Sequence, residues 1–112
     1  MLINTEVIHV DIPNKEKLYQ SYMPFVQGGG LFISSQLSIA MGADISLSIH
    51  LPEQSQPILL NAKVIWLTQK QNGLKPQGFA VQLIGEMGLY CHTEVEKLLK
   101  DFKAYTQTSY TM

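Results

Sequence analysis

Alternation of apolar and polar residues is the feature of this chain that most limits its possible folds. In residues 44–51, DISLSIHL, the side chains of Ile45, Leu47, Ile49 and Leu51 occupy every second position. A period of two places them on one face of a β-strand and the polar residues between them on the other. Turn-forming segments, MGAD before this stretch and LPEQSQP after it, mark where the strand ends.

Four further segments have the composition of strands. They are TEVIHVDI near the start, GGGLFIS, the β-branched run ILLNAKVIWLTQ and GFAVQLIG. In the third, the period of two predicts that Ala62, Val64 and Trp66 share one side. The loop KQNGLKPQG, with its Asn-Gly pair and its proline, predicts a hairpin between the last two strands. TEVIHVDI alternates imperfectly and suits an edge strand.

The period changes to that of a helix near the C-terminus. One helical stripe contains Cys91, Val95, Leu98, Leu99 and Phe102. Strands first and one helix last predict a mainly β fold, an antiparallel barrel or sandwich closed by a C-terminal amphipathic helix. We expect one domain over residues 1–104 and a flexible tail over 105–112, in which Tyr105, Tyr110 and Met112 can dock onto a partner.

Charge and composition exclude several classes of function. The net charge is −1 and all 8 basic residues are lysines, so the chain has no arginine fork for phosphate or guanine, and nucleic-acid binding is not expected. The single cysteine excludes an internal disulfide. The N-terminus has no basic segment leading into an apolar run, and no stretch approaches the roughly 20 apolar residues of a membrane span. We expect a cytoplasmic protein.

The three consecutive glycines in YMPFVQGGGLFI allow two interpretations. They can cradle a phosphate, or they can turn the chain into a strand. A phosphate loop needs a lysine and a Ser/Thr directly after the last glycine, whereas Leu31 and Phe32 follow Gly30 here. The backbone role is therefore favoured, because glycine tolerates positive φ.

No set of residues predicts catalysis or a metal site. The 3 histidines are far apart in sequence, and the cluster CHTEVE reads as a helix whose Cys91 faces the core and whose His92 and Glu96 face solvent. Ser34 and Ser35 lack the glycine frame of a nucleophile elbow. An enzyme with Cys91 as nucleophile needs a neighbour that stabilises the thiolate, and only His92 is adjacent. We expect no enzyme, cofactor or metal.

The remaining candidates for function are apolar and aromatic. Tyr22, Pro24 and Phe25 precede the glycines in a segment rich in turn residues, and Trp66 lies in the long strand. Tyrosine and tryptophan dominate binding hot spots, although both are also common in cores. For Met23 and Phe25 the sequence favours a core position at one end of the barrel, while both interpretations stay open for Tyr22 and Trp66.

Four stretches in this order resemble the PilZ domain family, in particular its small stand-alone members of type IV pilus assembly. They are LYQSYMPFVQGGGLFI, MGADISLSIHLP, AKVIWLTQ and QGFAVQL. The resemblance implies a six-stranded antiparallel β-barrel. Ligand-binding PilZ domains hold cyclic di-GMP with an R-x-x-x-R motif and a D/N-x-S-x-x-G motif. The first is absent here, and aligning the second on Gly30 places Phe25 at the acidic position and Gln27 at the serine.

The resemblance therefore implies an adaptor that does not itself bind cyclic di-GMP. It implies a role in type IV pilus biogenesis and twitching motility, through contacts with the pilus extension ATPase and a GGDEF–EAL cyclic di-GMP receptor, and recruitment to the pilus base. The residues expected at the ATPase are Tyr22 and Trp66, with Pro24 and Phe25 beside them. The helix end and the tail from Tyr105 to Met112 are expected at the EAL partner. The alternative is a cyclic di-GMP receptor that uses lysines and backbone N–H groups in a non-standard site.

Overall fold

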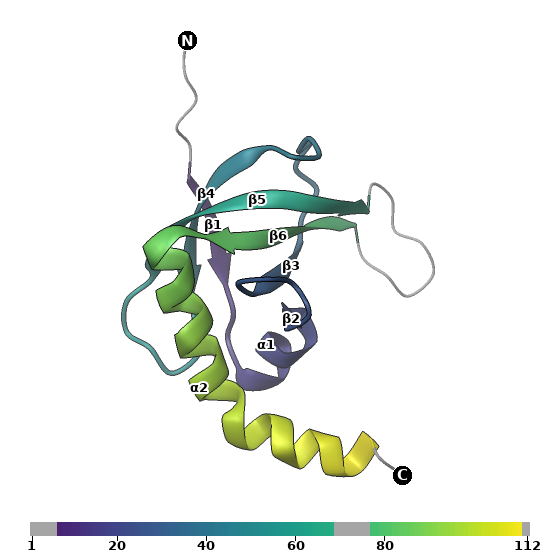
Figure 1. Cartoon of the computed structure of the whole chain (residues 1–112), viewed down its shortest axis with the longest axis vertical. Coiled ribbons are helices and arrows are strands. Elements are labelled where there is room, and N and C mark those ends of the chain that lie inside the picture. The colour runs from purple at the N-terminus through teal and green to yellow at the C-terminus, as the bar shows by residue number, and fades with distance from the viewer. Residues whose placement is uncertain (1–6, 69–76, 111–112) are drawn as a thin grey trace.

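The computed structural model describes residues 7–68 and 77–110, with the backbone alone for residue 101 and residues 103–110. Six strands form one mixed sheet in the order β1-β4-β5-β6-β3-β2, and a long C-terminal helix packs against it (Figure 1). The elements along the chain are β1 (Val7–Asp11), α1 (Lys15–Ser21), β2 (Tyr22–Met23), β3 (Gly30–Ser34), β4 (Asp44–His50), β5 (Ile58–Thr68), β6 (Gly78–Ile84) and α2 (Gly85–Tyr110).

The central hairpins follow the sequence pattern. Strand β4 pairs antiparallel with β5, and β5 pairs antiparallel with β6. The predicted face of residues 44–51 is confirmed: Leu47, Ile49 and Leu51 are buried in the core, while Asp44 and His50 are exposed. Alternation in β4 thus separates a core face from an outer face of the sheet.

The expectation of a closed, fully antiparallel barrel is wrong. Strand β1 lies at the sheet edge, as expected, but pairs with β4 in parallel. The chain between them contains α1, β2 and β3, which is ample for the crossover that a parallel pair requires. At the other edge of the sheet, β2 has only 2 residues, and α1 directly precedes it. Among the described residues no strand pairs with both β1 and β3, so the sheet does not close into a barrel.

Helix α1 was not expected from the sequence. Its N-cap is Asn14, whose side-chain Oδ1 accepts from the Lys17 backbone N–H at 2.8 Å, and Glu16 lies in its first turn. Leu18 is fully buried and anchors this short helix to the core. The Asn14 cap after Pro13 was the available signal.

The C-terminal helix was expected, and α2 begins at Gly85, where φ is +78°. Cys91, Val95 and Leu99 are buried, and Leu98 and Phe102 pack against the core at its edge, so the predicted stripe is confirmed. The backbone of residues 105–110, predicted as a tail, continues this helix, while 111 and 112 lie outside the described residues. The division of the chain at residue 104 stays a prediction.

Candidate functional site

A β-bulge decides which way the only tryptophan of the chain points. Val64 pairs with Val81, but Trp66 pairs with Ala80, so Ile65 is an extra residue in β5. The bulge reverses the alternation: Val64 is buried, while 59% of the Trp66 surface is exposed. Ala62 and Val64 share the buried side as predicted, but the prediction is wrong for Trp66, because the period of two holds only while the pairing register is continuous.

Trp66 belongs to a cross-strand row on the outer face of the sheet. Ala80 is its partner on β6, and Ala80 pairs in turn with Phe32 on β3. Ala80 is fully buried between these two aromatic neighbours. The Phe32 ring also extends over Gly78, where an added Cβ would lie 2.8 Å from Phe32 Cζ. We call the row of Trp66, Ala80 and Phe32 the aromatic row.

The loop between β2 and β3 presents a second aromatic residue. Phe25 is 79% exposed and Pro24 is also exposed. The loop is held by its own backbone, since Val26 N–H donates to Met23 O at 3.2 Å. Its Gln27 carbonyl accepts from the Gln82 side chain at 2.8 Å.

This bond places the loop beside the aromatic row. On β6, Gln82 lies two positions from Ala80, and residues at this spacing lie on the same face of a strand. The Phe25 loop and the aromatic row therefore border one continuous stretch of the outer face of β6.

The glycines have the backbone role that the sequence favoured. Gly28 has φ of +79° and Gly29 has φ of +93°, a region that other residues rarely adopt. The His92 ring covers Gly29: an added Cβ would lie 2.9 Å from His92 Cδ2. Gly30 is equally confined, because a Cβ there would lie 2.8 Å from Val26 Cγ2. The turn is packed against helix α2 and has no open cradle over Gly29.

Tyr22 lies inside the molecule, with 7% of its surface exposed. Its hydroxyl donates to the Glu96 carboxylate of α2, and its ring lies 6.0 Å from that of His92, centroid to centroid. Glu96 Oε2 also lies 3.6 Å from His92 Nε2. Burial, and then the hydrogen bond and charge of Glu96, raise the pKa of the Tyr22 phenol. These contacts tie β2 to α2 directly beneath the glycine turn.

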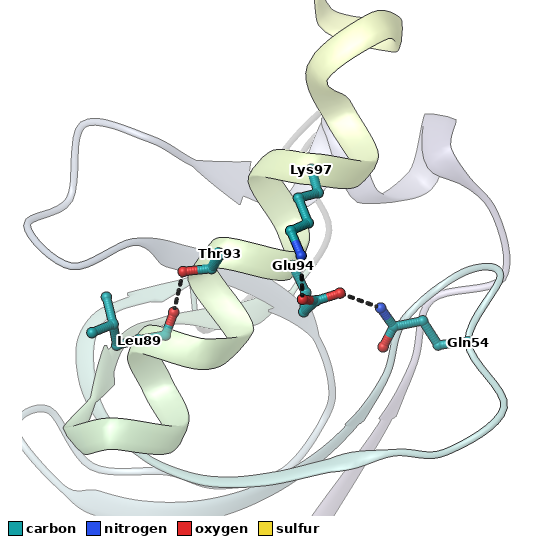
Figure 2. A network of polar contacts seen from close by, with 5 residues as sticks. All are labelled: Gln54, Leu89, Thr93, Glu94 and Lys97. Carbon is teal, nitrogen blue, oxygen red and sulfur yellow. Dashed lines mark hydrogen bonds and ion pairs between the residues drawn. The ribbon is translucent and has the colours of Figure 1, made fainter.

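A second polar cluster fastens α2 to the loop between β4 and β5 (Figure 2). The Gln54 side chain reaches from this loop and donates to Glu94 Oε1 at 2.9 Å, and Lys97 Nζ lies 3.3 Å from Glu94 Oε2. On the neighbouring turn, the Thr93 hydroxyl donates to the Leu89 carbonyl at 2.9 Å. Together with the Tyr22–Glu96 contact, this cluster fixes the helix at two points.

The arrangement offers little for catalysis. Cys91 is fully buried, and burial followed by the charge of Glu94 raises the pKa of its thiol from 9.0 to about 12. A buried thiol with a raised pKa is a poor nucleophile. Within residues 7–68 and 77–110, no three His, Cys, Asp or Glu side chains are grouped closely enough to hold a metal ion.

The predicted contact residues do not form one group. Trp66, Pro24 and Phe25 are exposed, whereas Tyr22 is buried. The side chains of Tyr105 and Tyr110 and the whole of Met112 lie outside the described residues. Sequence reasoning missed Phe32 and Gln82, which connect Trp66 to the Phe25 loop. The available signal was the alternation in these two strands, which places Phe32 and Gln82 on the face opposite Leu31, Val81 and Leu83.

The family model of the PilZ domain matches residues 6–97, which cover most of the chain. The chain belongs to the PilZ domain family. This confirms the resemblance to the PilZ domain family. Among curated proteins, none matches the chain.

Membership places this chain in a family of cyclic di-GMP-linked adaptor and receptor domains. PilZ domains are binding domains and not enzymes. In this PilZ domain the match ends within α2, so the last part of that helix lies beyond it. None of the helices that the structure describes is long and apolar enough to span a membrane.

Proposed function

We propose that this PilZ domain is an adaptor of type IV pilus biogenesis and twitching motility that acts by protein–protein contacts and does not bind cyclic di-GMP. The observation that supports it most is the position of Phe25, which is 79% exposed where ligand-binding PilZ domains place a hydrogen-bonding acid. An exposed phenylalanine cannot accept a hydrogen bond from a guanine edge, but it provides apolar area to a protein partner.

The other parts of the ligand motif are also occupied or missing. The chain has no arginine, so it lacks the planar forks that stack on guanine and clamp phosphate. Gln27 replaces the serine of the motif, and its backbone carbonyl accepts from the Gln82 side chain. The His92 ring lies against Gly29, which leaves no space above that glycine for a nucleotide.

The surface proposed for the pilus extension ATPase is the outer face of β6 with its borders. It consists of Trp66 and Phe32 in the aromatic row and Pro24 and Phe25 in the adjoining loop. Tyr22 supports this surface from beneath, through Glu96 and His92, and makes no direct contact. It is a positioning residue for the Phe25 loop.

The second partner is a GGDEF–EAL cyclic di-GMP receptor, for which we propose the C-terminal part of α2 and the residues after it, with Tyr105, Tyr110 and Met112. This region lies beyond the family match at residue 97. In Figure 1 the C-terminal end of α2 projects away from the sheet, so a partner there does not compete with one at the aromatic row. Such an adaptor is cytoplasmic and is recruited to the pilus base by its partners.

Two titrations test the proposal. Calorimetry with cyclic di-GMP, against a PilZ domain with both motifs as positive control, should show no heat. Saturable heat at micromolar ligand would establish the alternative, a receptor with a non-standard site. In the second, the Trp66 emission is followed while the extension ATPase is added, and saturation with a blue shift is expected because the indole leaves water.

Matched variants then locate the surface. Phe25→Ala should weaken ATPase binding about tenfold or more, the range for an interface aromatic. Leu89→Ala is the control, since Leu89 is similarly exposed, at 63%, but lies at the start of α2. Equal binding by wild type and Phe25→Ala would reject this surface while leaving the cyclic di-GMP result unaffected.

A further inference from the structure

The place where the sheet fails to close is a cleft between β1 and β3. It has a volume of about 440 Å³ and is lined by residues 9–12 of β1 and the segment after it, residues 31–34 of β3, and Lys17, Gln20 and Ser21 of α1. None of the predicted contact residues that the structure describes lines this cleft. Phe32 of the aromatic row lies at its border, but its floor is the core face of β3 with Leu31 and Ile33.

Backbone groups of β3 point into this cleft. Leu83 N–H donates to Gly29 O at 3.0 Å and Ser35 N–H donates to Gln77 O at 3.0 Å, so the odd-numbered residues from 29 to 35 direct their N–H and C=O groups toward β6. The even-numbered residues therefore direct theirs the other way. Strand β2 pairs on that side only as far as Leu31. The N–H and C=O of Ser34 and the C=O of Phe32 have no strand partner there among the described residues.

The facing edge of β1 has the same property. Ile12 N–H donates to His50 O at 2.9 Å, and Asp11 pairs with His50 in the parallel register. Even-numbered residues of β1 therefore bond to β4, and the N–H and C=O groups of His9 and Asp11 point away from it. Since β1 is the edge strand, no described strand pairs with these groups.

Side chains add a single unpaired charge to the cleft. Lys17 is exposed and forms no ion pair with any residue that the structure describes. The Asp11 carboxylate lies 3.3 Å from His50 Nδ1 and is therefore engaged. The floor is apolar, with Leu31, Ile33 and Ile12 all buried. The cleft thus combines two β edges, an apolar floor and one cation.

We propose that this cleft binds an extended segment of a partner protein, which carries an acidic residue opposite Lys17 and pairs by β-augmentation with β3 and β1. Free N–H and C=O groups on two facing edges are complementary to an extended strand, which is the only backbone form that offers both groups on both sides. A second copy does not fit this description, because its edge strand is already attached to its own sheet and cannot enter between two edges. The site goes beyond the proposed contact with the ATPase.

The topology also sets the direction of the segment. β2 is antiparallel to β3, and β3 is separated from β1 by β6, β5 and β4 in the sheet order. A segment antiparallel to β3 would continue the line of β2 and run parallel to β1. Every second side chain would meet the apolar floor. The partner segment therefore alternates apolar and polar residues.

A designed peptide tests the proposal directly. The probe is a capped peptide of about seven residues, alternating threonine and valine with one threonine replaced by aspartate. Added to the full-length protein up to about 1 mM, it should shift the amide resonances of residues 7–11 and 31–34 saturably, with a Kd of about 10⁻⁴ M. The same peptide with N-methyl groups on the alternate backbone nitrogens that face β3 should not bind, since it cannot donate to that edge.

Two variants of one residue separate backbone pairing from side-chain contact. Ser34→Pro removes an N–H that points away from β6 and fixes φ, a change that edge strands tolerate, and it should weaken the peptide about tenfold. Ser34→Ala keeps that N–H and should bind as wild type does. Lys17→Met should weaken the aspartate peptide about threefold and leave its all-threonine counterpart unchanged.

Several results would overturn the proposal. These are the absence of shifts at 1 mM peptide (about ten times the expected Kd), equal binding of the N-methylated peptide, and shifts located outside the two edges. Shifts at the same amides on raising the protein concentration without peptide would replace a partner segment with self-association. If Ser34→Pro fails to fold, as its amide spectrum would show, the N-methylated peptide still decides.

Discussion

Substitution of Gly29 by alanine should destabilise this protein through two separable effects. The first is backbone strain, since φ is +93° at this residue, and a side chain in the left-handed region costs about 1–2 kcal/mol. The second is steric, because the new Cβ would lie 2.9 Å from His92 Cδ2 and 3.4 Å from His92 Cβ. The ring cannot turn aside freely, because contact extends to its Cβ and its Nε2 is near Glu96.

We expect the steric effect to add about 1–2 kcal/mol, as overpacking typically does. The total is then about 3 kcal/mol. For a chain of this size 1 kcal/mol corresponds to about 4 °C in the unfolding midpoint, so thermal denaturation should show a decrease of about 12 °C.

Gly42 provides the matched control. Its φ is +78°, and a Cβ added there would meet nothing within 4 Å, so Gly42→Ala carries the backbone strain alone. It should lower the midpoint by about half as much as Gly29→Ala. In a double-mutant cycle, His92→Ala should reduce the additional loss caused by Gly29→Ala. Equal midpoints for the two glycine variants would refute the packing of His92 on the turn.

Three further predictions concern single side chains. Cys91 should make the free energy of unfolding fall at high pH. The pKa of its thiol is about 12 in the folded protein and 9.0 without burial and Glu94, so its contribution to stability is full below pH 9 and is lost as pH rises toward 12. Between pH values below 9 and pH 10, the free energy of unfolding from urea denaturation should fall by about 1.4 kcal/mol more for the wild type than for Cys91→Ala. Identical pH profiles of the two proteins would contradict this. Tyr22→Phe should lower the free energy of unfolding by about 1 kcal/mol, because the hydrogen bond to Glu96 is lost. An unchanged free energy of unfolding would contradict a stabilising role for that bond. Trp66→Ala should change stability by less than about 1 kcal/mol, because the indole is largely exposed, and a larger loss in thermal denaturation would place it in the core.

Much of the fold could be predicted because its signals are local. The face of β4 with Leu47 and Ile49 and the stripe of α2 with Cys91 and Val95 are both periodic patterns within one element. Each requires only that the element bury one side, whatever it packs against. The hairpin of β5 and β6 was likewise marked by its turn residues.

The candidate site could be predicted only in part. Exposure of Pro24 agrees with its place in a turn-rich segment, whereas Phe25, for which the sequence favoured a core position at one end of the barrel, is exposed. Tyr22 adjoins them in sequence but is buried, because it is the first residue of β2 and faces Glu96 on α2, 74 residues away. No property of the local sequence reports a contact across such a separation.

The sequence by itself determined the mainly β class, the amphipathic C-terminal helix, the backbone role of the glycines and the absence of an arginine fork, since each depends on residue type and short spacing. Only the tertiary structure decided the outward direction of Trp66, the parallel pairing of β1 and the open cleft beside β3. The physical reason is that these depend on register and partner choice between distant strands. One extra residue at Ile65 reverses a face, and one short helix at Lys15–Ser21 separates two edges, without altering the apolar pattern on either side.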